Sequence, residues 1–255
     1  MTIDLTRHEE FALVTINQPE ALNALSFSLV RDIGRAIDEA AATPARALLF
    51  IGAGDKAFCA GADINELAGR SLTQEKAGAA SGQAIFAKLD GLPIPSVAIV
   101  NGYAFGGGLE LAMACTFRVA TPGAKMGLPE IKLGLIPGYG GTQRLPRLVG
   151  EARAAEMVMT GRTVEAEEAL QIGLVNRLVE GDTLAGGVAF AREFTGYSLP
   201  VLAWAREAVH RALDTPLHEG LKIEADLSTL AFQTEDSVEG TKAFLEKRKP
   251  EFRDG

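Results

Sequence analysis

Two short, continuous apolar runs constrain the fold of this chain more than any other feature. Ala47–Ile51 and Ser96–Val100 contain almost no polar residues, and each is followed by a loop of small residues and then by a helical pattern. Such runs are typical of strands buried on both faces, which occur mainly in parallel sheets covered by helices. Phe11–Ile16 predicts a further strand, and the strand-then-helix order indicates right-handed β-α units. The sequence therefore predicts the α/β class.

Helical patterns separate these strands. Between residues 26 and 42, Leu29, Ile33 and Ile37 recur every four residues, as on the apolar face of an amphipathic helix. Helices are also predicted at Gln74–Leu89 and Leu109–Cys115, and a strand at Phe117–Ala120.

The character of the chain changes after about Thr195. Helices are predicted at 200–212, 217–233 and 237–249, and no strand pattern remains. This region is smaller than most self-sufficient domains, so we expect it to pack on the main body or on another subunit. We therefore divide the chain into a core, residues 1–195, that holds the functional site, and a helical C-terminal subdomain, residues 196–255.

Charge limits the classes of partner. The net charge is −8 and the pI is about 5.1, so nucleic acid is a poor partner. An anionic ligand would need a local basic cluster, and Lys247, Arg248 and Lys249 form one. Cys59 and Cys115 form no metal or redox motif, and the three histidines lack metal-ligand spacing, so we expect neither metal nor redox cofactor.

The N-terminus carries no recognisable targeting signal. Met1–Glu10 contains Asp4, Glu9 and Glu10 and has no long apolar run, and no stretch of about 18 apolar residues occurs anywhere. We therefore expect a cytoplasmic protein without a membrane span.

Two loops place small residues between a buried strand and a helix. They are Ala60–Asp63 and Gly106–Glu110, and such loops leave backbone N–H groups uncovered beside a helix N-terminus. Two N–H groups pointing into one space would form an oxyanion hole; alternatively, the glycines only let a helix pack closely on a strand. The sequence contains no G-x-G-x-x-G, no P-loop and no G-x-S-x-G motif.

Two glutamates are candidates for acid–base chemistry. Glu110 lies in the first turn of the helix that the glycines open, and Glu130 lies in the Gly127–Glu130 loop. Each has a simpler interpretation, Glu110 as a favourable charge on an exposed first turn of a helix and Glu130 as a solvated loop residue. If both faced one reacting centre, one could act as base and one as acid, and burial would raise both pKa values. The sequence alone leaves these alternatives open.

Several separated motifs resemble the crotonase (enoyl-CoA hydratase/isomerase) family. The motifs are PEALNAL at 19–25, AGADI at 60–64, NGYAFGGGLELA at 101–112, GLPE at 127–130, GLIPG at 134–138 with GGT at 140–142, and AFLEKR at 243–248. They occur in the family's order over nearly the whole chain. Thr116 and Met126 depart from the pattern, where relatives often place Asp and an aromatic residue, and neither change removes a catalytic group.

The resemblance implies a fold, a site and an assembly. The fold is expected to be a spiral of β-β-α units with a helical C-terminal region, assembled as a homotrimer or a dimer of trimers. Glu110 and Glu130 match the family's catalytic carboxylates, and the N–H groups of Ala62 and Gly107 match its oxyanion hole. The matched residues for binding the acyl-CoA substrate are Ala21, Leu22, Ala60, Asp63, Ile64, Phe244 and Lys247.

The presence of both glutamates favours an enoyl-CoA hydratase. This enzyme is a hydro-lyase that reversibly adds water to a trans-2-enoyl-CoA in fatty-acid or related acyl-CoA degradation, such as β-oxidation. Coenzyme A is part of the substrate, and no separate cofactor is expected. The alternatives are a Δ3,Δ2-enoyl-CoA isomerase, which needs only one carboxylate, another acyl-CoA enzyme of the family, such as a thioester hydrolase, and a non-enzymatic RNA-binding or scaffolding protein. We expect Glu130 to act at C2 of the substrate and Glu110 to activate water, although the sequence does not fix which is the acid.

Overall fold

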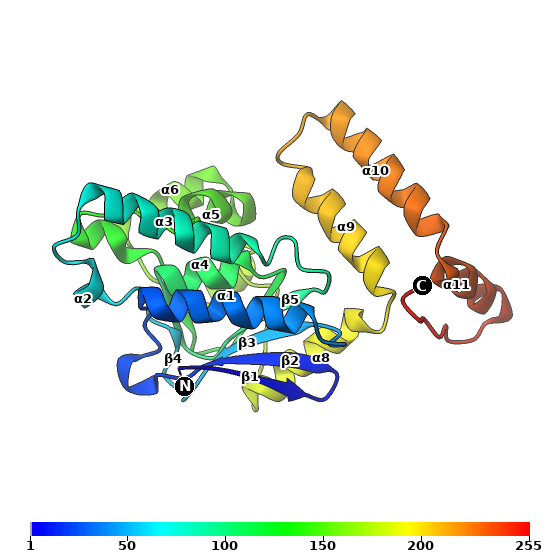
Figure 1. Ribbon diagram of the computed structural model, residues 1–255, viewed down its shortest axis with the longest axis horizontal. Helices are drawn as coiled ribbons and strands as arrows, with labels where there is room; N and C mark the ends of the chain where they lie inside the picture. The colour runs from blue at the N-terminus through cyan, green and yellow to red at the C-terminus, as the bar shows by residue number, and fades with distance from the viewer. Residues whose placement is uncertain (1) are drawn as a thin grey trace.

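The computed structural model describes residues 2–255, which form two sheets wound into a spiral and surrounded by helices (Figure 1). The strands of the larger sheet, in spatial order, are β1 (Ile3–His8), β2 (Phe11–Ile16), β3 (Leu48–Gly52), β5 (Ser96–Val100), β7 (Phe117–Ala120) and β10 (Arg177–Leu178). The strands of the smaller sheet are β4 (Ala57–Cys59), β6 (Tyr103–Phe105), β8 (Lys125–Gly127) and β9 (Val164–Glu165). Pairing is parallel except between β1 and β2 and between β8 and β9.

Successive turns of the spiral give one strand to each sheet. β3 and β4, then β5 and β6, then β7 and β8 are consecutive pairs, with the first member in the larger sheet and the second in the smaller. The expected spiral of β-β-α units is confirmed. The helices of this part of the chain are η1 (Pro19–Ala21), α1 (Phe27–Ala41), α2 (Ile64–Leu67), α3 (Leu72–Ala87), α4 (Gly107–Ala114), η2 (Pro129–Leu133), α5 (Gly141–Val149), α6 (Glu151–Thr160), α7 (Ala166–Gln171) and α8 (Thr183–Thr195).

The buried apolar runs form the strands that the sequence predicts. β2 and β5 have the predicted bounds, and β3 begins one residue later, at Leu48. All five residues of β5 are buried because helices cover both faces of the larger sheet, as Figure 1 shows for α1 and α8. The strands of the smaller sheet are two or three residues long, too short for a periodic pattern, and the sequence did not reveal them.

The helix predicted at 74–89 in fact begins two residues earlier, as α3. Ser71 is its N-cap, and the side chains of Ser71 and Gln74 each accept from the other residue's backbone N–H to form a capping box. α3 lies beside α1, and its residues Gly82 and Phe86 are buried (Figure 1). Two other residues of α3, Glu75 and Ala79, line the cavity described below.

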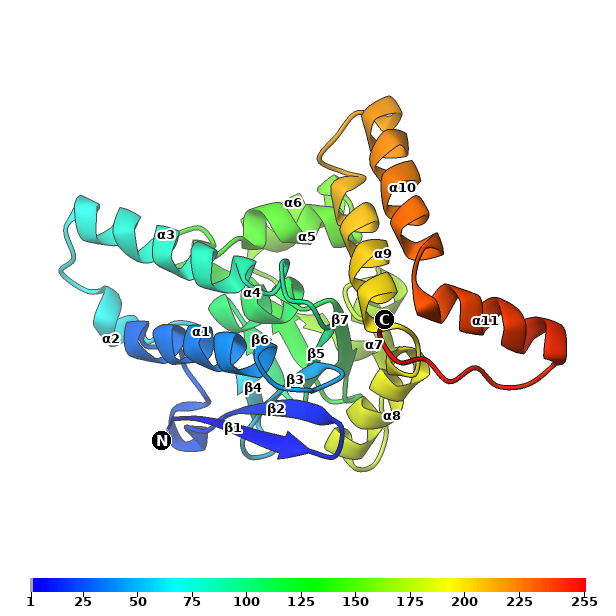
Figure 2. The same ribbon diagram turned by 45° about the vertical axis from the view of Figure 1, so that its right-hand side comes forward.

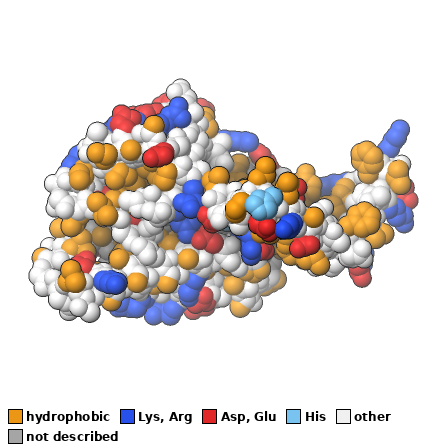
Figure 3. Space-filling view, turned by 90° about the horizontal axis from the view of Figure 1, so that it is seen from above, with side chains coloured by type: hydrophobic (Ala, Val, Ile, Leu, Met, Phe, Trp, Pro, Cys, Tyr) orange, Lys and Arg blue, Asp and Glu red, His pale blue; other side chains and the backbone are white. Residues whose placement is uncertain are grey.

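The last three helices extend away from the spiral. They are α9 (Leu199–Arg211), α10 (Leu217–Phe232) and α11 (Glu235–Glu246). Figure 2 shows α10 and α11 projecting from the main body, and no residue of α9 or α10 is buried. Hydrophobic side chains lie exposed on the projecting part of the molecule (Figure 3). Among the exposed residues of these helices are Phe232, Phe244 and Leu245.

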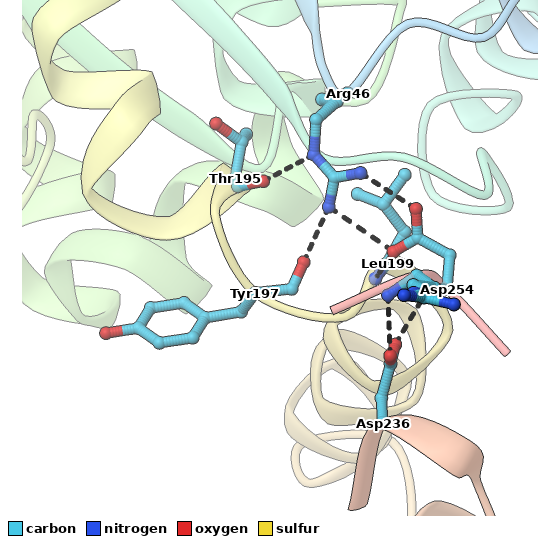
Figure 4. Close-up of polar contacts among 7 residues, drawn as sticks. Arg46, Thr195, Tyr197, Leu199, Asp236 and Asp254 are labelled. Carbon is cyan, nitrogen blue, oxygen red and sulfur yellow. Dashed lines mark hydrogen bonds and ion pairs between the residues drawn. The ribbon is translucent and has the colours of Figure 1, made fainter. Parts of the chain in front are cut away.

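Arg46 ties the base of these helices to the spiral (Figure 4). Its guanidinium donates to the carbonyl oxygens of Thr195 and Tyr197, at 2.6 and 2.7 Å, and pairs with Asp254 at 2.8 Å. Asp254 also accepts from the backbone N–H of Leu199. The C-terminal tail thus contacts the connection between α8 and α9.

Asp236 holds the other side of the same tail. Its carboxylate is buried and accepts from the backbone N–H groups of Arg253 and Asp254 at 2.7 and 2.9 Å (Figure 4). The start of α11 and the C-terminal residues therefore form one unit.

Among residues 2–255, no helix is both long and apolar enough to cross a membrane.

Candidate active site

A cavity of about 410 Å³ lies where the smaller sheet meets the helices. It is bounded by the start of α4, by η2 and the loop after it, and by the segment from α2 to α3. The residues that line it are Phe27, Ala60, Gly61, Ala62, Ile64, Leu67, Glu75, Ala79, Gly106, Gly107, Glu110, Pro129, Glu130, Lys132, Leu133, Leu135, Ile136, Gly138 and Tyr139. Four sequence candidates, Ala62, Gly107, Glu110 and Glu130, thus meet at one cavity.

Glu110 is a buried carboxyl group with two fixed hydrogen-bond donors. It lies in the first turn of α4 with only 2% of its surface exposed, so the interpretation as an exposed helix-end charge is wrong. Its Oε1 accepts from the backbone N–H groups of Gly141 at 2.7 Å and Tyr139 at 2.8 Å. Burial raises its pKa to about 7, the two N–H groups oppose this rise, and the nearby Glu130 charge adds to it. Glu110 can therefore gain or lose a proton near neutral pH.

Glu130 faces the same cavity from η2. Burial raises its pKa, and its Oε2 is enclosed without a hydrogen-bond partner among residues 2–255. Its Oε1 passes so close to Gly106 that a Cβ there would meet it at 2.9 Å. A buried carboxyl oxygen without a partner is costly, so it marks a place where a water or substrate atom would be stabilised.

Two backbone N–H groups border the carboxyl pair. Ala62 follows β4 and Gly107 is the first residue of α4, where a helix leaves its N–H groups unpaired. Within residues 2–255, neither N–H donates to another residue of the chain. Gly61, at φ 109°, and Gly106, at φ 49°, turn the two loops towards each other, so that a Cβ on Gly61 would lie 3.1 Å from the Phe105 carbonyl oxygen.

Close packing fixes the start of α4. A Cβ on Gly108 would meet the carbonyl oxygen of Cys59 at 2.1 Å, which leaves no room for any side chain. Both roles that the sequence leaves open for these glycines, close packing and exposure of a backbone N–H, are present. The glycines let α4 pack against β4, and they uncover the N–H of Gly107.

The remaining predicted binding residues divide into two groups. Ala60 and Ile64 line the cavity. Leu22 accepts from the N–H of Ala60 through its carbonyl oxygen, next to Ala21, and the Asp63 side chain caps α2 by accepting from Asn65. These five positions lie in or beside the wall of the cavity.

Phe244 and Lys247 do not reach this cavity within one chain. Phe244 lies on α11 and is 83% exposed, and Lys247 ends that helix with φ 54°. α11 therefore ends earlier than the predicted Lys249. In the basic cluster, Arg248 is already paired with Glu239 and Glu246.

No sequence pattern reveals the groups that hold Glu110. Tyr139 and Gly141 act through backbone N–H groups, which no side-chain motif reveals. The sequence signal for this contact is the glycine at position 141, because a Cβ there would lie 3.0 Å from Glu110 Oε1. Phe27, Glu75 and Ala79 are also absent from the sequence candidates, since they come from α1 and α3.

No metal-binding cluster accompanies these residues. Across the described part of the chain, no three His, Cys, Asp or Glu residues are arranged to hold a metal ion. The thiols of Cys59 and Cys115 are fully buried, which raises both pKa values to about 12. The polar groups at the cavity are the carboxyl pair, the two backbone N–H groups and the side chains of Glu75, Lys132 and Tyr139.

Comparison with known proteins relates the whole chain to one family. A family model described as enoyl-CoA hydratase/isomerase matches residues 6–255. A probable enoyl-CoA hydratase of Mycobacterium bovis is 44% identical over 252 residues, covering 98% of this chain and 97% of the relative. A crotonyl-CoA hydratase of Syntrophomonas wolfei is 41% identical with the same coverage. The crystal structure of an enoyl-CoA hydratase from Bacillus anthracis covers all of both chains with a TM-score of 0.94 and 34% identity.

The chain belongs to the enoyl-CoA hydratase/isomerase family. The resemblance seen in the sequence motifs is confirmed, and so is the crotonase-like fold.

Proposed function

We propose that this protein is an enoyl-CoA hydratase, a hydro-lyase that reversibly adds water to a trans-2-enoyl-CoA thioester to give a 3-hydroxyacyl-CoA. The observation that carries the proposal is that two carboxyl groups, the buried Glu110 and the half-buried Glu130, line one cavity. Relatives named enoyl-CoA hydratase and crotonyl-CoA hydratase support it.

The chemistry requires two proton transfers around one water molecule. Water attacks C3, one carboxylate accepts its proton, and the electrons of the C2–C3 double bond move onto the thioester oxygen as an enolate. Return of these electrons to C2, with a proton from the other carboxyl group, completes the addition. Acid–base catalysis of this kind contributes roughly 10²–10⁴-fold. No metal, redox cofactor or separate coenzyme takes part.

The N–H groups of Ala62 and Gly107 would stabilise the enolate oxygen. Each preorganised donor of an oxyanion hole is worth on the order of 3 kcal/mol of transition-state stabilisation. Two such donors would stabilise the charged enolate oxygen more than the neutral thioester oxygen.

The pair works when it carries one proton. The doubly protonated pair lacks a base and the doubly ionised pair lacks an acid, so activity requires the singly protonated state. The raised pKa of Glu110, about 7, keeps that state populated near neutral pH. In catalysis we assign Glu110 to the water and Glu130 to C2, so the reactive form is the singly protonated pair with its proton on Glu130, whose unpartnered Oε2 is free to approach a substrate atom.

The test is the loss of conjugated-enoyl absorbance when the purified protein meets crotonyl-CoA. The wild type should remove the signal, and Glu110→Gln and Glu130→Gln should each be slower by at least about 100-fold. Glu180→Gln, at an exposed glutamate outside the cavity lining, is the matched control and should match the wild type. No loss of absorbance with crotonyl-CoA or with longer 2-enoyl-CoA thioesters would overturn the proposal.

A Δ3,Δ2-isomerase is the alternative within the family. It moves a proton between C2 and C4 and activates no water, so one carboxylate is sufficient. Incubation of 3-enoyl-CoA with the wild type and with both Gln variants separates the two activities. Efficient isomerisation that survives the loss of one glutamate, without hydration, would favour the isomerase.

We also propose a division of labour along the chain. Residues 1–195 would form the catalytic core, and residues 196–255 would join copies of the chain into a homotrimer or a dimer of trimers. The exposed Phe232, Phe244 and Leu245 support this, because such side chains are normally covered in an assembly. Light scattering of the purified protein would measure the mass directly.

Assembly would also give Phe244 and Lys247 a role at the substrate. A neighbouring copy could bring them to the adenosine end of CoA, where the Lys247 ammonium would meet a phosphate. Cytoplasmic fatty-acid degradation by β-oxidation is the setting that we propose for this activity.

A further inference from the structure

We infer that Asp90 and Arg144 are positioning residues for Glu110: their ion pair anchors the first turn of α5, which supplies an N–H donor to Glu110. The inference rests on the proposed function, since it assigns a role to this pair in the acid–base chemistry of Glu110. Neither residue lines the cavity, and neither belongs to the sequence candidates.

The starting point is the way in which α5 begins. Its N-cap is Gly140, which has no side chain to cap the helix, and its first residue, Gly141, donates its N–H to Glu110 Oε1 at 2.7 Å. The catalytic carboxylate thus acts as the N-terminal cap of α5. Movement of this turn would lengthen the hydrogen bond from the Gly141 N–H, which lowers the pKa of Glu110.

α5 lacks one of its intrahelical hydrogen bonds. Pro146 lies inside the helix and has no N–H, so the carbonyl group of Thr142 lacks the usual intrahelical donor four residues ahead. The first turn is therefore less firmly joined to the rest of the helix and depends more on contacts with other elements.

Arg144 provides such a contact. Its Nη1 and Nη2 donate to Oδ1 and Oδ2 of Asp90 at 2.9 and 2.6 Å, the two-point geometry that fixes both distance and orientation. Its backbone N–H also bonds the carbonyl oxygen of Gly140 at 2.8 Å. The pair is half-buried, so solvent screens it less than a fully exposed pair.

Asp90 joins this turn to α3. It follows the end of that helix, and its N–H bonds the carbonyl oxygen of Ala87. Tyr139, just before α5, packs edge-to-face on Phe86 of the same helix with ring centroids 5.6 Å apart. α3 therefore holds the segment on both sides of Gly141.

Other charged and titratable groups lie near Glu110 and near the ion pair of Asp90 and Arg144. Those facing Glu110 are Glu130, Tyr139 and Arg144. Those near the ion pair are Cys115, Arg118, Arg206 and His210.

When Asp90 is replaced, a loss of positioning and a loss of charge change the pKa of Glu110 in different directions. Removal of the Asp90 carboxylate takes away a negative charge, and charge alone would leave the pKa of Glu110 unchanged or lower it. Loss of the anchor weakens the N–H bonds to the Glu110 carboxylate, which raises that pKa. Asp90→Ala therefore distinguishes positioning from simple electrostatics.

The direct measurement is the infrared band of the protonated Glu110 carboxyl group in the free protein, identified by its absence in Glu110→Gln. In Asp90→Ala the titration of this band should move to higher pH by about half a unit or more. Asp214→Ala is the matched control, because Asp214 pairs with Arg147 in the last turn of α5 and lies 60% exposed. Its titration should coincide with that of the wild type.

Kinetics give a second measurement. The alkaline limb of kcat/KM for crotonyl-CoA reports the last proton of the carboxyl pair and should move upward with the infrared titration. Should Asp90→Ala fail to fold, Asp90→Asn keeps the side-chain shape and should shift in the same direction.

An unchanged or lowered titration in the Asp90 variants would overturn the inference, as would a uniform loss of activity at every pH. Absence of hydration in the wild type, with the infrared shift present, would refute the proposed function and leave the positioning role intact.

Discussion

The carboxylate of Glu110 and the backbone N–H of Gly141 form a hydrogen bond of 2.7 Å that joins two helices at the cavity. Glu110 lies in the first turn of α4, and Gly141 begins α5. The bond stabilises the ionised carboxylate, whereas burial disfavours it, and the balance raises the pKa of Glu110 to about 7. Burial and hydrogen bonding thus act in opposite directions and together give Glu110 a pKa near neutral pH.

Gly141→Ala should damage this balance. A Cβ there would lie 3.0 Å from Glu110 Oε1 and 2.9 Å from Pro137 Cβ, so the turn must move. We expect kcat to fall by roughly 10- to 100-fold with KM changed much less, because a misplaced acid–base group costs rate more than binding. Steady-state kinetics with crotonyl-CoA measure this, and Gly196→Ala, where a Cβ would meet nothing within 4 Å, is the control. A normal kcat in Gly141→Ala would contradict the expectation.

Glu110 should also make stability depend on pH. Its pKa is raised from 4.5 in the unfolded chain to about 7 in the folded protein, so between these values only the folded state holds the proton. Stability from this group is complete below about pH 4.5 and is lost as the pH rises through 7. The loss is on the order of 3 kcal/mol.

Urea unfolding at pH 5 and pH 8 tests this. The free energy of unfolding of Glu110→Gln minus that of the wild type should increase with pH, since Gln cannot ionise. A difference that stays constant would show that Glu110 titrates near its ordinary value.

Phe27 should limit the acyl chain. Its ring lines the cavity, and the Arg70 guanidinium lies 4.0 Å from the ring centroid while pairing with Glu75. This packed group forms part of the wall between α1 and α3. Phe27→Ala should enlarge the cavity and raise kcat/KM for a 2-octenoyl thioester relative to crotonyl-CoA by several-fold. A ratio equal to that of the wild type would exclude Phe27 from the acyl site.

Arg46→Met should loosen the C-terminal helices. The variant leaves the carbonyl oxygens of Thr195 and Tyr197 and the carboxylate of Asp254 without their donor. We expect a loss of about 1–3 kcal/mol in stability and faster hydrogen exchange in α9 and α11. Arg35→Met, at a 68% exposed side chain on α1, is the control and should change little. Equal exchange rates in both variants would show that Arg46 does not hold these helices.

Much of the fold could be predicted from the sequence. The continuous apolar runs identify β3 and β5, and the four-residue spacing of Leu29, Ile33 and Ile37 identifies α1, because burial on both faces or on one face leaves a direct pattern. The smaller sheet could not be predicted, since β4, β6 and β8 have three residues each and exist through pairing with one another.

The sequence by itself determined the family, the two loops of small residues and the two candidate glutamates. Only the tertiary structure decided that Glu110 and Glu130, twenty positions apart, line one cavity, and that Tyr139 and Gly141 hold Glu110. The physical reason is that burial and backbone hydrogen bonds arise from contacts between elements distant in the chain. A pKa near 7 is a property of that packed environment, whereas the residue type alone specifies an ordinary carboxyl group.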